Sequence, residues 1–507
     1  MLLKPLLRNA AERGSSPAIF DDFGQMTWAD IASKAKKLAK IIRFKTKQER
    51  VGILLPTSGA FAVGFYATLL AGKVAVPFNF LLGEKETEHI LSDSGIDLVL
   101  SVQKLLDNVD AGAVVKRAAE AGRIGLMDLQ KMSPSLGTVL PQLLPLKTPD
   151  YGEDDLAAVL YTSGTSGLPK GVELTHGNLD SDVHSAIERA ELDRAGEQHV
   201  FLSPIPLFHS TGLLATMLCP MQLSAKMIYI ARFSPAKIIE GLREHHVTVM
   251  AAVPSMYQAI ARTKSAKPED FSHMYMAISG GEPLPARIRT LFKDRFHTDL
   301  MEGYGLTETC GPISVNSPPS HRPGSVGKLL PAATASIRDD DGNEVPTGET
   351  GEVWMKGPMI FKQYSGLPDA TAEAKTSEGF FKSGDLGHID EDGYLFITGR
   401  KKDMIIVSGE NVYPREIEEM ITEMPEVEEA AVIGRADKSR GEVPVAYVIA
   451  AEGQEASAEA IRQHCKERGL PQFKIPKDFI VTDDLPRSPT GKVLKRELLE
   501  RDKARAS

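Results

Sequence analysis

Short apolar segments of β-strand character alternate with amphipathic helical segments along most of this chain. VGILL (51–55) precedes a helical run at 60–71, and VAVPF (74–78) follows it. The same order of strand, helix and strand recurs between Lys226 and Pro254. Strands joined in this way pair in parallel and are covered by helices. The pattern therefore predicts an α/β fold with largely parallel sheets.

One uncharged stretch, Val51 to Gly72, raises the question of a membrane span. The turn-forming segment PTSG (56–59) divides it into a strand-like and a helix-like piece. Each piece is shorter than the roughly 20 residues that cross a bilayer. We therefore predict strand, turn and helix, and no integral membrane segment.

The second half of the chain changes character twice. Between Ala332 and Val407 it is rich in strands and in Asp-Gly and Gly-Glu turns, which is typical of antiparallel sheet. After Arg400 a small α+β pattern begins. We predict a large N-terminal domain (1–399) that includes a smaller β-rich subdomain, a hinge (400–402) and a small C-terminal domain (403–507).

Charge and cysteine content exclude several classes. The net charge of −9 comes without a basic stripe, which argues against nucleic-acid binding. The three cysteines are widely spaced and odd in number, so neither a disulfide framework nor a zinc knuckle is indicated. The N-terminus lacks the apolar core of a signal peptide. We expect a cytoplasmic protein.

The segment YTSGTSGLPKG (161–171) concentrates glycines, hydroxyls and one lysine after an apolar run. Its spacing differs from the G-x-x-x-x-G-K-[ST] loop of nucleoside triphosphatases. Glycines nevertheless let backbone amides point at an anion, and Lys170 adds charge. Composition alone leaves two readings open, a phosphate cradle and an ordinary surface loop.

This segment resembles the phosphate loop of the adenylate-forming enzymes, which include acyl-CoA synthetases, aryl-CoA ligases, luciferases and adenylation domains. Other segments similar to motifs of that superfamily follow in order. They are 207-LFHSTG-212, 279-SGGEPLP-285, 302-EGYGLTET-309, 382-KSGDLG-387, 399-GRKKDMIIVSGENVYPREIE-418 and 487-RSPTGK-492. The resemblance implies a mobile C-terminal domain, ATP and Mg²⁺ as cofactors, and a reaction in two halves. A carboxylate attacks the α-phosphate of ATP, and a thiol then attacks the acyl-adenylate and expels AMP.

The resemblance also implies roles for individual residues. Glu308 is the expected magnesium ligand, and Thr307 contacts the α-phosphate. Tyr304 stacks on adenine, Asp385 contacts the ribose, and Arg400 contacts the ribose or a phosphate. The full set of implied ATP and AMP contacts is Thr162, Ser163, Gly164, Thr165, Ser166, Gly167, Lys170, Gly281, Glu282, Pro283, Glu302, Gly303, Tyr304, Gly305, Thr307, Asp385, Arg400 and Lys492.

Lys492 resembles the C-terminal lysine that reaches the α-phosphate and the attacking carboxylate, so Lys492, Thr307 and Glu308 are the expected catalytic residues. Lys402 is the expected hinge, and Ser408 and Gly409 line the expected pantetheine tunnel. The expected acyl pocket comprises Phe208, His209, Gly212, Gly280 and Gly305.

The identity of the acid rests on the segment PIPLFHSTGLL (204–214), which is apolar and lacks the aspartate that binds a substrate ammonium in amino-acid-activating domains. We predict a fatty acid, with an aryl acid as the alternative. The acceptor is CoA or the phosphopantetheine thiol of an acyl carrier protein. A non-catalytic binding protein is a further alternative, and the oligomeric state is left open.

Overall fold

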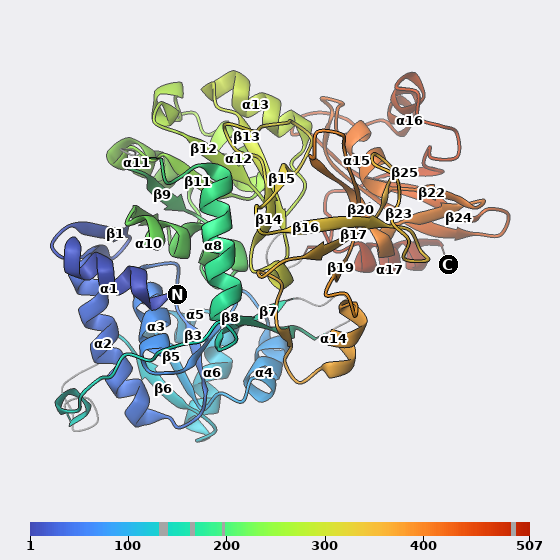
Figure 1. Cartoon of the computed structure of the whole chain (residues 1–507). Coiled ribbons are helices and arrows are strands. Elements are labelled where there is room, and N and C mark those ends of the chain that lie inside the picture. The colour runs from blue at the N-terminus through green and yellow to red at the C-terminus, as the bar shows by residue number, and fades with distance from the viewer. Residues whose placement is uncertain (131–139, 163–167, 195–197, 488–492, 507) are drawn as a thin grey trace. The chain divides into compact units, whose positions relative to one another are not determined.

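The structure, a computed structural model, describes residues 1–130, 140–162, 168–194, 198–487 and 493–506 (Figure 1). They form two compact units. The first comprises Met1–Gly281, Phe292–Thr334 and Met355–Phe381, and the second comprises Glu282–Leu291, Ala335–Trp354 and Lys382–Ser507.

Two sheets with parallel central strands form the first unit, as the strand–helix alternation predicts. The described part of the larger sheet has nine strands in the spatial order β15 (Lys328–Leu329), β14 (Pro312–Val315), β13 (Leu300–Gly305), β12 (Met276–Ser279), β11 (Val249–Ala252), β9 (Val200–Ser203), β10 (Lys226–Tyr229), β1 (Pro17–Asp21) and β2 (Gly24–Thr27). The strands from β13 to β1 are parallel, whereas β14, β15 and β2 are antiparallel to their neighbours.

The smaller sheet has, among the described residues, the order β18 (Gln363–Tyr364), β8 (Lys170–Thr175), β7 (Leu156–Thr162), β4 (Val74–Pro77), β3 (Arg50–Leu54), β5 (Leu98–Ser101) and β6 (Gly125–Asp128). Its strands from β7 to β6 are parallel. Helices of this unit are α1 (Leu3–Glu12), α2 (Trp28–Lys45), α3 (Gly59–Leu70), α4 (Glu84–Asp93), α5 (Gln103–Asn108), α6 (Asp110–Glu120), α8 (His176–Ala190), α9 (Ser210–Leu213), α10 (Cys219–Leu223), α11 (Pro235–His245), α12 (Pro254–Arg262) and α14 (Pro368–Ala374).

The uncharged stretch from Val51 to Gly72 forms β3, a turn and α3, so the predicted strand, turn and helix are confirmed. Almost every side chain of α3 is buried. A helix that is apolar on all sides belongs inside a protein core, which is where α3 lies. None of the helices in the described part of the chain is both long and apolar enough to cross a membrane.

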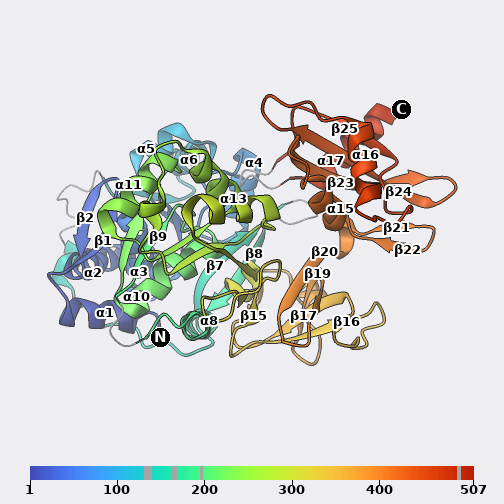
Figure 2. The same cartoon turned by 90° about the horizontal axis from the view of Figure 1, so that it is seen from above.

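The second unit holds the strand-rich segment and the C-terminal segment (Figure 2). Its elements include the sheet β16 (Thr334–Arg338), β17 (Gly351–Lys356), β19 (Phe381–Ile389) and β20 (Leu395–Arg400), and a sheet of β22 (Glu410–Val412), β21 (Ile405–Val407), β24 (Gly441–Ala450), β23 (Val427–Asp437) and β25 (Asp478–Val481). Its helices are α15 (Pro414–Ile421), α16 (Ala458–Glu467) and α17 (Lys495–Ala506), while α13 (Ala286–Phe296) is divided between the units.

The expected hinge, 400–402, lies within this second unit, where Lys402 is part of the short 3-10 helix η5 (Lys401–Asp403). The two compact units are defined by contacts within the structure, whereas the predicted hinge concerns movement of one part of the chain relative to another. The division into 1–399 and 403–507 about Lys402 therefore stays a prediction about movement between the half-reactions.

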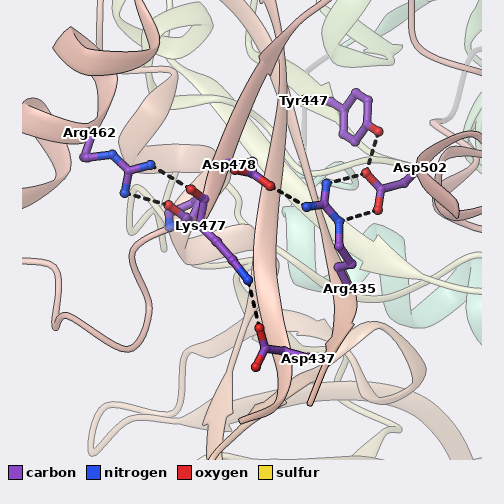
Figure 3. Close-up of polar contacts among 8 residues, drawn as sticks. Arg435, Asp437, Tyr447, Arg462, Lys477, Asp478 and Asp502 are labelled. Carbon is purple, nitrogen blue, oxygen red and sulfur yellow. Dashed lines mark hydrogen bonds and ion pairs between the residues drawn. The ribbon is translucent and has the colours of Figure 1, made fainter. Parts of the chain in front are cut away.

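An ion-pair cluster holds the last helix, α17, to the C-terminal sheet (Figure 3). Arg435 on β23 donates to both carboxylate oxygens of the buried Asp502 on α17, each at 2.7 Å, and also pairs with Asp478. The Tyr447 hydroxyl donates to Asp502 Oδ1 at 2.7 Å. Hydrogen bonds from Arg435 are the main reason that the pKa of Asp502 lies below its usual range. This cluster fixes the helix that follows Lys492 closely in the chain.

We expect Asp502→Ala to destabilise the C-terminal unit by about 1.5–3 kcal/mol, because it removes the charge-assisted hydrogen bonds from Arg435, which keeps Asp478 as a partner. Since the pKa of Asp502 is lowered by folding, its contribution is present above the unfolded pKa of about 4 and is lost as the pH falls through the folded value. Denaturant unfolding of the full chain near neutral pH and in acid measures both effects. Asp484→Ala is the matched control, because Asp484 forms an exposed ion pair with Arg501, which lies on α17 like Asp502. This exposed pair is expected to contribute about 0–1 kcal/mol to stability. Equal losses in the two variants would contradict the prediction.

Candidate functional site

In the larger sheet, the predicted site segments of the first unit follow the carboxyl ends of parallel strands. The segment 204–214 follows β9, Gly280 follows β12, and Tyr304 to Glu308 span the end of β13 and the 3-10 helix η4 (Thr307–Thr309). Neighbouring β12 and β13 are paired in parallel, with Ser279 opposite Glu302. The carboxyl ends of parallel strands lie at the same edge of a sheet, so the topology brings these segments to one edge. Ligands of open α/β sheets bind at this edge.

In the smaller sheet, β7 and β8, which flank the glycine-rich segment in the chain, pair in antiparallel fashion. Thr162 and Lys170 lie opposite each other in this pair. β7 is parallel to β4, so the segment also follows the carboxyl end of parallel strands. Ser163, Gly164, Thr165, Ser166 and Gly167 lie outside the described residues.

One tyrosine connects the two sheets at this edge. The Tyr364 hydroxyl on β18 donates to Glu308 Oε1 at 2.8 Å, and the Lys170 ammonium lies 5.1 Å from the centre of the Tyr364 ring. The backbone N–H of Phe361 donates to the Glu308 carbonyl at 2.8 Å, which is a second hydrogen bond between the segment around Tyr364 and Glu308. Burial, with the adjacent Glu308 carboxylate, raises the pKa of Tyr364, so the hydroxyl stays a donor.

Tyr364 is a site residue that the sequence analysis missed. It lies 56 positions from Glu308 and outside every quoted motif. A tyrosine in the segment KQYSG carries no local signal of this contact. Only the pairing of β18 with β8, which sets Tyr364 opposite Val172, brings its hydroxyl to Glu308.

The residues around Glu308 fit a magnesium ion that is held mainly by phosphates. Among the described residues no group of three or more His, Cys, Asp or Glu side chains is arranged to enclose a metal. Magnesium in nucleotide sites takes one or two carboxylates and otherwise phosphate and water oxygens. A single carboxylate oriented by the Tyr364 hydroxyl meets that requirement.

In the second unit, the predicted ribose contact Asp385 is adjacent to Arg400, the predicted ribose or phosphate contact. Asp385 on β19 and Arg400 on β20 lie directly opposite each other in the antiparallel pair. Arg400 Nε is 2.6 Å from Asp385 Oδ1, and the side chain of Asp385 is buried. The Ser383 hydroxyl accepts from the Asp385 backbone N–H at 3.0 Å. The carboxylate is therefore held in one orientation by the strand pair and by its cation.

The predicted tunnel residues form the loop of the β21–β22 hairpin. Val407 pairs with Glu410, which leaves Ser408 and Gly409 as a two-residue turn, with φ of 54° and 91°. Two positive φ values are what a type I′ turn requires, and glycine adopts them without strain. The structure thus supplies a reason for Gly409 that is independent of a tunnel.

The predicted acyl-pocket residues include the cap of a short helix. His209 precedes α9, and its Nδ1 accepts from the Thr211 backbone N–H at 3.4 Å. Phe208 is buried, and its ring meets that of Phe80 edge to face with centroids 5.0 Å apart. Gly305 is required by packing: a Cβ there would lie 1.8 Å from the carbonyl oxygen of Gly311.

Comparison with known proteins identifies the family of this chain. Residues 6–365 match the model of the AMP-binding enzyme family, and residues 416–492 match that of the AMP-binding enzyme C-terminal domain. The chain belongs to the AMP-binding enzyme family. Its predicted membership of the adenylate-forming superfamily and its α/β fold class are confirmed.

Relatives of this AMP-binding enzyme include a feruloyl-CoA synthase from an Amycolatopsis species, 34% identical over 94% of both chains. A long-chain-fatty-acid–CoA ligase, FadD13 of Mycobacterium tuberculosis, is 34% identical over 94% of this chain and 93% of its own. The o-succinylbenzoate coenzyme A synthetase of Bacillus subtilis, solved with ATP and a magnesium ion, superposes with a TM-score of 0.83 at 29% identity, covering 98% of this chain and 99% of its own. The predicted enzyme class, an AMP-forming acid–CoA ligase, is confirmed by this family.

Proposed function

We propose that this enzyme activates a fatty or aryl carboxylic acid with ATP, releases pyrophosphate, and transfers the acyl group from AMP to the thiol of CoA. The observation that carries the proposal is the approach of Glu308 and Lys170 to Tyr364 from different sheets. One carboxylate and one ammonium at the carboxyl ends of parallel strands match the needs of a metal-bound triphosphate.

The nucleophiles of both half-reactions belong to the substrates, so the protein contributes charge and alignment. Lys170 stabilises the phosphates that leave as pyrophosphate. Asp385 accepts from the ribose hydroxyls, and Arg400 keeps that carboxylate in place. Lys492 neutralises charge at the α-phosphate and positions the attacking carboxylate. Glu308 would hold the magnesium ion, which would supply positive charge to neutralise the phosphates.

The acid is proposed from the apolar segment around His209 and from the names of the relatives, which include both fatty-acid and feruloyl enzymes. CoA is the proposed acceptor, and a carrier-protein thiol is the alternative. A cytoplasmic location is also proposed. It is supported by three buried cysteines that form no disulfide.

The test is ATP–pyrophosphate exchange with short, medium, long and aromatic acids. Each active acid is then assayed for thioester formation with CoA and with a phosphopantetheinylated carrier protein. Exchange with at least one acid and thioester formation with CoA are expected. Failure of every acid to support exchange would overturn the catalytic function, and transfer to the carrier alone would replace CoA as the acceptor.

We expect Tyr364→Phe to weaken the use of magnesium while the fold persists. The change removes the hydroxyl that orients the Glu308 carboxylate, and such partners of metal ligands alter metal affinity by about 10-fold to 100-fold. Pyrophosphate exchange as a function of Mg²⁺ concentration, and calorimetric titration of ATP with and without Mg²⁺, measure the effect.

The control for that variant is Tyr151→Phe, which removes a partly buried hydroxyl that donates to the Leu69 carbonyl at 2.6 Å in another part of the same unit. This control should leave the magnesium dependence unchanged. An identical magnesium dependence in Tyr364→Phe and Tyr151→Phe would show that the hydroxyl only supports packing.

A further inference from the structure

Asp182, in the middle of α8, is a buried carboxyl group to which the proposed chemistry assigns no role. Asp182 is fully buried, and neither its Oδ1 nor its Oδ2 atom has a hydrogen-bond partner. Burial raises the pKa of Asp182 well above its usual range. Leaving a polar group without a partner in the interior is unfavourable, and aspartate is also a poor residue for the centre of a helix.

The local structure gives no compensation for this unfavourable position. α8 is a regular helix, begun by a capping box in which Thr175 and Asn178 exchange hydrogen bonds at 2.9 and 3.0 Å. A leucine or an alanine in place of Asp182 would suit both the helix and its surroundings. An unsatisfied buried group in a native protein calls for an explanation, and a ligand that supplies the missing partner is one.

The neighbours of Asp182 connect it to the proposed acyl pocket. A Cβ built on Gly311 would lie 3.3 Å from Asp182 Oδ2 and 3.3 Å from Leu214 Cδ2, so the three residues meet at one point. The carbonyl of Gly311 packs directly on Gly305, a predicted pocket residue. Leu214 lies two positions after Gly212, which is another predicted pocket residue.

The segment opposite α8 is itself unusual. Leu214–Leu218 forms one turn of π-helix between α9 and α10, and this turn packs against α8. π-helical turns are rare and occur frequently at functional sites. Thr216 within it is satisfied, because its hydroxyl lies 2.6 Å from the Gly212 carbonyl and 2.8 Å from the Ser203 hydroxyl. Neither contact involves the Asp182 carboxyl.

We propose that Asp182 is a specificity-determining residue at the far end of the acyl pocket, where its carboxyl group hydrogen-bonds a hydroxyl or amino group that the acid carries remote from its reacting carboxylate. The inference rests on the proposed acid-activating function. A protonated carboxyl group both donates to and accepts from a hydroxyl, whereas a carboxylate would pair with an ammonium. An acid that ends in a methyl group would leave Asp182 unpartnered, so the site discriminates against it.

The experiment compares acids that differ only at the remote end. Matched pairs are para-hydroxycinnamic with para-methylcinnamic acid, and omega-hydroxydodecanoic with tridecanoic acid; omega-aminododecanoic acid is the cationic probe. The kcat/KM of pyrophosphate exchange is expected to favour a polar member by at least roughly a hundredfold. Preference for the hydroxyl or for the amine distinguishes the two forms of the proposal.

Two variants separate recognition from folding. Asp182→Leu should reverse the preference toward the methyl acids, while Asp182→Asn, which still donates and accepts, should retain part of it for hydroxyl acids. Asp180→Asn on the same helix is the control, because Asp180 is partly exposed and lies beside His184. Without any variant, the polar acid should raise the Tm of the wild-type enzyme more than its methyl partner does.

Three results would overturn the inference. Equal use of polar and methyl acids by the wild type, together with equal Tm shifts, would remove the proposed contact. An unchanged preference in a folded Asp182→Leu variant would assign the preference to another residue. Absence of exchange with all of these acids and with the wider panel would refute the acid-activating function itself, and this inference with it.

Discussion

Lys492→Ala is expected to lower ATP–pyrophosphate exchange by roughly a hundredfold to a thousandfold, the usual effect of removing one group that stabilises transition-state charge. The thioester half-reaction, started from supplied acyl-adenylate and CoA, should stay close to wild type. The reason is that Lys492 is proposed to act only on the α-phosphate and the attacking carboxylate. Separate assays of exchange and of thioester formation measure the two halves.

The control for this variant is Lys503→Ala, which removes an exposed lysine of α17 that forms a surface ion pair with Glu500. It should leave both half-reactions unchanged. Lys492 lies outside the described residues, but α17 begins shortly after it and is held by Arg435 and Asp502. Equal loss of both half-reactions in Lys492→Ala would refute the movement of the C-terminal domain between them.

The elements that the sequence predicted best are those set by local patterns. The segment VGILL, the turn PTSG and the apolar helix after it appear as β3 and α3 because strand length, turn residues and apolar periodicity act within a few positions. The small α+β pattern expected after Arg400 appears as α15, β23 and β24 together with the elements that follow them. The antiparallel strand β8 and the edge strand β18 were not predicted as separate strands.

The contacts that the sequence could not predict join distant segments. Tyr364 reaches Glu308 only because two residues of β18 add to the edge of the smaller sheet. Asp182 lies on the same buried face of α8 as Leu179 and Val183, and the helical pattern does not reveal that its carboxyl group has no hydrogen-bond partner there. In both cases the chemistry depends on which elements pack together. The apolar periodicity of a single helix or strand does not show which other elements contact it. Gly409 is the reverse case, since the local turn alone explains it.

We expect Glu308→Gln to lower pyrophosphate exchange by at least roughly a hundredfold near the wild-type Mg²⁺ requirement, because a divalent cation contributes several kcal/mol of charge stabilisation that an amide ligand retains poorly. The amide keeps the shape of the side chain and an oxygen that can accept from Tyr364, so the variant should fold. Raising the Mg²⁺ concentration should restore part of the activity. A loss that no Mg²⁺ concentration changes would assign Glu308 to another task.

The double variant decides whether Tyr364 acts through Glu308. If the Tyr364 hydroxyl serves only to orient the Glu308 carboxylate toward the metal, Tyr364→Phe should cost little further activity in the Glu308→Gln background, and the two losses will not add. If the losses do add, the Tyr364 ring contributes separately, through the Lys170 ammonium that lies over it. Exchange rates of the two single variants and the double variant at matched Mg²⁺ concentrations give this coupling directly. Tyr151→Phe in the same background is the control for loss of a hydrogen-bonded tyrosine hydroxyl elsewhere in the unit.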